Sequence, residues 1–209
     1  MAKDCNDSSN NHPTKMDVAL STLFPNQKPS VWSSACGDLN NDGIDDWALV
    51  LIGQRVNVQN NETLAVLFGK PDGTFSVPAV SDEFCHVRYH YNLSIEQNTL
   101  SVQGFPNLHG SSYILEFKYN AELGNIALVG EEHIEGDDEK NFSYGASADY
   151  LNQEIIYFRT ENNKHKKVKK KLKKRNLIGL HGFNCETYNE KFQELYFYID
   201  ENFNFNNQR

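Results

Sequence analysis

Two apolar runs of strand length, 47–53 (WALVLIG) and 63–69 (TLAVLFG), constrain the fold of this chain more than any other feature. A polar segment, 54–62, separates them, and the turn signal KPDG follows the second run at 70–73. A strand that is apolar at nearly every position is typically buried on both faces. The two runs therefore predict an antiparallel hairpin whose strands both lie inside the protein.

Shorter strand candidates follow, and Gly, Asn, Asp or Pro separates nearly all of them. The predicted strands are 32–36, 85–91, 99–103, 112–119, 126–131, 142–149, 154–159 and 177–182. In 113–119 (YILEFKY), Tyr, Leu and Phe alternate with Ile, Glu and Lys, which is the period of a half-buried strand. The pattern predicts a mainly β fold with little helix, its antiparallel sheets forming a sandwich or a partial propeller.

The length of 209 residues suits one domain. Residues 1–15 are polar and predict a disordered tail, whereas 16–200 predict a single β-rich domain with a loop and hairpin at 36–69. A short helix is expected within 16–26, and a frayed end at 201–209.

The segment 187–199 has two interpretations. Thr187 and Glu190 could form a capping box that starts a helix. The run ELYFYID at 194–200 is also a good strand, and we favour the strand slightly.

An acidic loop, 38–46 (DLNNDGIDD), leads into the first apolar run. Side-chain oxygens occur at its positions 1, 3, 5 and 9, which are Asp38, Asn40, Asp42 and Asp46. A chain coiled around one ion turns alternate residues inward, and calcium takes six to eight oxygen ligands. Gly43 permits the sharp turn, and Ile44 would contribute its carbonyl oxygen. The spacing predicts a calcium site at the entry to a strand; the alternative is an Asx-rich turn without an ion.

The segment 37–50 (GDLNNDGIDDWALV) resembles the calcium loop and following strand of FG-GAP/VCBS-type repeats. The resemblance implies a loop that joins strands of an extracellular β-propeller blade. It implies the same ligands: Asp38, Asn40, Asp42, the Ile44 carbonyl and Asp46. The chain carries this element once, a layout similar to that of bacterial secreted or periplasmic proteins with a single such hairpin. We expect the ion to stabilise the fold rather than to take part in catalysis.

Four widely spaced cysteines, Cys5, Cys36, Cys85 and Cys185, contain no CxxC pair, which argues against a zinc site. Two disulfides would suit an oxidising compartment, with three pairings possible; four buried thiols are the alternative. No signal peptide and no run of about 20 apolar residues is visible. We expect a periplasmic or secreted protein without a membrane span.

Charge is unevenly distributed along the chain. Residues 164–175 (KHKKVKKKLKKR) hold nine of the twenty Lys and Arg and no acid. The rest carries 11 basic and 28 acidic residues, a net charge of −17. We interpret 164–175 as a flexible, solvated hairpin loop, or as a segment that contacts the acidic remainder of the chain. An acidic protein, a lipid surface or nucleic acid are its alternative contacts. The absence of aromatic residues within it argues against nucleic acid.

No motif of a hydrolase, zinc protease, P-loop or dinucleotide site occurs in the sequence. His86 and His90 lie four apart in a predicted strand, too far apart to bind one ion. We therefore expect a calcium-binding protein, not an enzyme, that acts through a protein partner. A narrower hypothesis is an immunity or inhibitor protein whose acidic surface attracts a basic toxin or lytic enzyme. A hydrolase with an unrecognised site is the remaining alternative.

Overall fold

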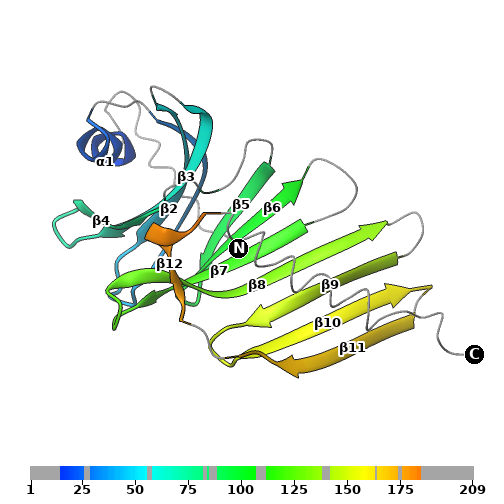
Figure 1. The fold of residues 1–209 in the computed structure, drawn as a ribbon. Coiled ribbons are helices and arrows are strands. Elements are labelled where there is room, and N and C mark those ends of the chain that lie inside the picture. Colours follow the sequence, from blue (N-terminus) through cyan, green and yellow to red (C-terminus); the bar gives the residue numbers. More distant parts are fainter. Residues whose placement is uncertain are drawn as a thin grey trace, which may run out of the picture.

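The chain forms two antiparallel sheets, of four and eight strands (Figure 1). The computed structural model describes residues 15–25, 29–55, 58–81, 84, 89–106, 112–137, 142–162, 164–173 and 176–184. The expectation of a mainly β fold with little helix is confirmed, and the two sheets pack face to face as in a sandwich. Residues 1–14 of the predicted tail, the segment 187–199 and the predicted frayed end at 201–209 lie outside the described residues, whereas Lys15 belongs to a helix.

The small sheet contains the predicted hairpin. Its strands, in spatial order, are β1 (Ser30–Gly37), β2 (Asp46–Arg55), β3 (Val58–Gly69) and β4 (Phe75–Val80). In the β2–β3 pair, Trp47 lies opposite Leu67 and Leu49 opposite Ala65. β4 was not predicted, because Pro78 interrupts its pattern; Pro is tolerated there because β4 is an edge strand.

The small sheet is buried on both faces, which explains its continuous apolar runs. One face is covered by helix α1 (Lys15–Leu23), which packs Leu20 against the sheet. The other face contacts the large sheet, and Leu64 and Val66 are fully buried there. The result is a layered arrangement of helix, small sheet and large sheet (Figure 1).

The large sheet is a meander in which each strand pairs with the next. Its strands are β5 (Tyr89–Glu96), β6 (Thr99–Pro106), β7 (Ser112–Asn120), β8 (Asn125–Asp137), β9 (Phe142–Asp149), β10 (Glu154–Glu161) and β11 (Lys164–Lys171). We call the face that contacts the small sheet the inner face; Val102, Leu115 and Phe117 are buried on it. The predicted alternation of 113–119 is thus confirmed.

The large sheet extends beyond the small one. The first part of β8 pairs with the two-residue strand β12 (Ile178–Gly179), and its second part pairs with β9. From there β9, β10 and β11 lead away from the small sheet (Figure 1). The strand predicted at 177–182 is in fact β12 followed by a single 3₁₀ turn, Leu180–Gly182.

The interpretation of 164–175 as a flexible loop was wrong, because 164–171 forms β11. Val168 and Leu172 lie four residues apart, a spacing that suits a helix. In an extended chain, residues four apart also point to the same face, because side chains alternate between the two faces. There they pack with Ile155 and Tyr157 of β10. This small apolar contact fixes an otherwise basic segment as a strand.

Candidate calcium loop

The loop 38–46 lies between β1 and β2. Two of its residues have the left-handed backbone conformation, Asn41 with φ 65° and Gly43 with φ 82°. Asn is among the residues that tolerate this conformation, and Gly adopts it without steric cost. Two such turns within three residues coil the chain tightly, as the sequence predicts for a loop around one ion.

Backbone amides hold the side chains of the coil in place. The carboxylate of Asp38 accepts hydrogen bonds from the amides of Asp42 at 3.1 Å and Gly43 at 2.9 Å. Asp42 Oδ1 accepts from the Ile44 amide at 2.8 Å, and Asn40 Oδ1 from the Asp42 amide at 3.0 Å. Asn40 Nδ2 donates to Asp42 Oδ2 at 3.0 Å. Three of the predicted ligands are therefore neighbours within one coil.

Ile44 is half-buried and packs against the end of β3. A Cβ atom on Gly69 would lie 2.8 Å from the Ile44 side chain and 2.4 Å from the Asp45 carbonyl oxygen. Only glycine fits there, so the loop and β3 approach more closely than side chains would allow. The coordination by the Ile44 carbonyl stays a prediction.

Asp46 anchors the loop to the hairpin. Its carboxylate is fully buried and accepts hydrogen bonds from the amides of Leu39 at 2.8 Å, Asn40 at 3.1 Å and Gly69 at 3.0 Å. Burial raises the pKa of Asp46, and the three amides oppose that rise. A carboxylate has about four lone-pair positions, so the three bonds leave room for one further contact. Its role as a ligand stays a prediction, whereas its anchoring role is direct.

The donor set suits a hard cation better than a soft one. Asp38 and Asp42 bring carboxylates and Asn40 an amide oxygen, and oxygen donors of this kind favour calcium. Asp42 is exposed, so water could complete the coordination shell. In the described part of the chain, no three His, Cys, Asp or Glu side chains group closely enough to hold a metal. The candidate site therefore depends on two carboxylates supplemented by amide, carbonyl and water oxygens.

Asn98 connects the loop to the large sheet, and the sequence did not predict this contact. It lies in the turn between β5 and β6, with φ 58°, and donates through Nδ2 to the carbonyl oxygen of Asp38 at 2.9 Å. Nearby, a Cβ atom on Gly37 would lie 2.9 Å from the side chain of Ile95 in β5. Gln97-Asn98 is recognisable as a turn from sequence, but its docking partner, 60 residues away, is not.

No protein-family model, curated protein or solved structure matches the chain. None of the helices that the structure describes is long and apolar enough to cross a membrane.

Cys36 is buried and disulfide-bonded, and the other three cysteines lie outside the described residues, so the pairing stays open. His86 also lies outside them.

Acids and tyrosines also meet on the inner face of the large sheet, beyond the small sheet. Tyr150 donates its hydroxyl hydrogen to Glu131, and Tyr144 donates to Glu135. His133 lies between these two acids on β8, and burial lowers its pKa. No sequence motif marks these residues as a functional site.

Proposed function

We propose that this chain is a non-enzymatic binding protein of an extracytoplasmic compartment, and that its 38–46 loop holds one calcium ion as a structural element. The observation that supports the proposal most is the coil itself. In it, Asp38, Asn40 and Asp42 are held side by side by backbone amides. Amides alone do not neutralise two adjacent carboxylates, and a cation would relieve their repulsion.

Calcium in this loop would act on the junction between the two sheets. Asp46 ties the loop to β3 through Gly69, and Asn98 ties it to the turn between β5 and β6. Ligand binding that occurs only in the folded state adds to the free energy of unfolding. The ion would therefore stabilise the contact between the small sheet and the large sheet.

The stabilised protein would act by binding a protein partner. The net charge of −17 outside 164–175 supports a basic partner, because a negative surface attracts a positive one over long range. An immunity or inhibitor protein that blocks a basic toxin or lytic enzyme is the narrower form of this proposal. Turnover of a substrate by the purified protein would contradict it.

The calcium proposal is tested by thermal unfolding in chelator and in calcium. Extracellular calcium modules bind at about 10⁻⁴–10⁻³ M, so the titration extends to about 10 mM. At ten to one hundred times the Kd, binding adds about 1.4–2.7 kcal/mol to the free energy of unfolding. We expect Asp42→Ala to abolish most of the calcium-dependent rise in Tm.

Asp72→Ala is the matched control for that experiment. Asp72 is also an exposed turn aspartate, and it accepts hydrogen bonds from the Thr74 amide at 2.9 Å and the Thr74 hydroxyl at 2.6 Å. This variant should lose some baseline stability and keep the full response to calcium. An equal loss of response in both variants, or no response in the wild type, contradicts the assignment of the loop.

A further inference from the structure

β11 combines an open sheet edge with a high positive charge. Among the residues that the structure describes, it is the last strand in the order of the large sheet and pairs only with β10. Six of its eight residues are lysines, and another is His165. Strand edges present unpaired backbone donors and acceptors, and proteins commonly protect them with charged side chains, especially lysine. Six lysines in eight residues also make this edge strongly positive.

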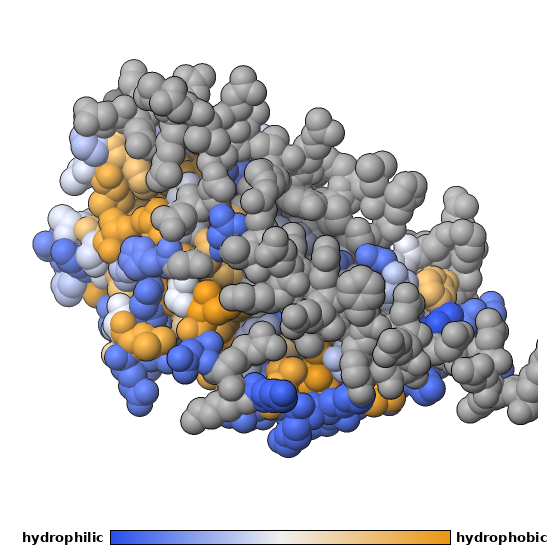
Figure 2. Space-filling model, viewed as in Figure 1, coloured by the Kyte–Doolittle hydropathy of each residue, from blue (hydrophilic) through white to orange (hydrophobic). Residues whose placement is uncertain are grey.

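The lysines of β11 are distributed over both faces of the sheet. Lys166 and Lys170 lie opposite Arg159 and Ile155, on the inner face. Lys167 and Lys169 lie opposite Phe158 and Ile156, on the outer face, since cross-strand partners share a face. In Figure 2, hydrophilic residues gather along the lower margin of the molecule, at the β9–β11 end.

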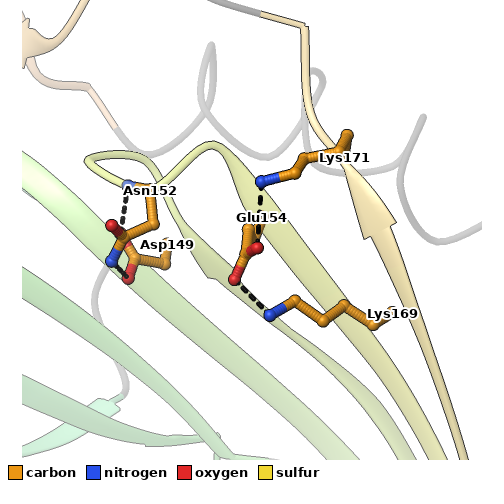
Figure 3. Close-up of polar contacts among 5 residues, drawn as sticks. All are labelled: Asp149, Asn152, Glu154, Lys169 and Lys171. Carbon is orange, nitrogen blue, oxygen red and sulfur yellow. Dashed lines mark hydrogen bonds and ion pairs between the residues drawn. The ribbon is translucent and has the colours of Figure 1, made fainter.

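Two of these lysines share one acid of the neighbouring strand. Glu154, at the start of β10, lies between Lys169 at 2.5 Å and Lys171 at 3.0 Å (Figure 3). Both contacts lower the pKa of Glu154, which keeps it ionised. One carboxylate does not neutralise both lysines. On the outer face, Lys167, Lys169 and Lys171 follow one another at about 6.6 Å, close enough to repel one another.

We propose that the β11 edge binds an extended acidic peptide segment of another protein, which adds to the large sheet as a further strand. Such a strand lies in the plane of the sheet, so its alternating side chains reach the lysines of both faces. Its backbone pairs with the open edge, as in other examples of strand addition. A polyanion lying on one face would contact only half of the lysines. The inference is independent of calcium binding and concerns a surface other than the acidic one.

The test measures binding of a labelled eight-residue peptide that alternates Glu with Thr, and of a second peptide with Glu on both faces. The control peptide has the same charge, but proline replaces residues whose amides would pair with β11. Proline removes the backbone donor and leaves electrostatic attraction unchanged. We expect the peptide with Glu on both faces to bind most tightly. The proline peptide should bind at least tenfold more weakly than the acidic peptide of the same charge.

Two protein variants separate the faces: K166Q/K170Q for the inner face and K167Q/K169Q for the outer face. Each should weaken binding of the doubly acidic peptide at least threefold, whereas Lys118→Gln on β7 should leave it unchanged. Thermal unfolding of each variant confirms that it is folded before binding is compared. Equal binding of the proline peptide overturns the proposal. It is also overturned if only one face matters, or if polyphosphate or a single-stranded oligonucleotide binds more tightly than every peptide.

Discussion

Asn98 donates its side-chain amide to the main-chain carbonyl oxygen of Asp38 at 2.9 Å, and so joins the turn of one sheet to the loop of the other. Asn98→Gly removes this bond but keeps a residue that accepts φ 58°. We expect a loss of about 1 kcal/mol in the free energy of unfolding, the usual value for one hydrogen bond. The calcium-dependent rise in Tm should also decrease.

Gln97→Gly is the control for Asn98→Gly. Gln97 belongs to the same turn and has φ 49°, but within the described residues its side chain forms no hydrogen bond to the loop. Chemical denaturation of both variants, with and without calcium, provides the comparison. If both glycine variants lose the same stability and the same response, the loop and the turn are not coupled through Asn98.

Asp46→Ala should destabilise the protein more than any other single change in the loop. It would leave the amides of Leu39, Asn40 and Gly69 without their acceptor inside the fold. An unsatisfied buried donor costs about 1–3 kcal/mol, so we expect a total loss of about 3 kcal/mol or more. Asp42→Ala, at an exposed position, should cost less than about 1 kcal/mol in chelator. Urea unfolding in chelator measures both, and equal losses would refute the anchoring role of Asp46.

Much of the fold follows from local patterns that the sequence contains. The runs in β2 and β3 are apolar on both faces because helix α1 covers one face of the small sheet and the large sheet covers the other. The coil of the loop follows from Asx residues and Gly43, whose backbone preferences are local. These features could be predicted because each depends on residues close together in the chain.

The features that were missed depend on distant contacts. The sequence of β11 predicts a solvated segment. Its strand conformation depends on contacts with another part of the chain, because Val168 packs with Tyr157 and the strand pairs along β10. β4 could not be predicted, because Pro78 argues against a strand unless that strand is known to lie at the edge of a sheet. The anchoring role of Asp46 requires Gly69, 23 residues away, and spacing within the loop cannot indicate it.

The cysteines provide a test of the compartment. Cys36 is disulfide-bonded, and we expect protein made in an oxidising compartment to contain at least one disulfide. Mass spectrometry after alkylation without reductant should therefore find two or more cysteines unmodified. Four alkylated cysteines would place the protein in a reducing compartment instead.

His133 should make stability depend on pH. Burial lowers the pKa of His133, and Glu135 opposes this only in part. Between that lowered pKa and about 6.5, the unfolded chain binds more protons than the folded one, so stability falls as the pH falls. His133→Gln should flatten the dependence of urea midpoints between pH 7 and 5. An unchanged slope in this variant would assign the dependence to other groups.

Calorimetric titration of calcium into chelator-treated protein tests the central claim most directly, since it reports stoichiometry as well as affinity. We predict one site per chain, with a Kd of about 10⁻⁴–10⁻³ M. Asp38→Asn combined with Asp42→Asn should abolish the binding heat in a protein that is still folded. Absence of binding to the wild type at 10 mM calcium, or an unchanged isotherm in the double variant, would contradict a calcium site in the 38–46 loop.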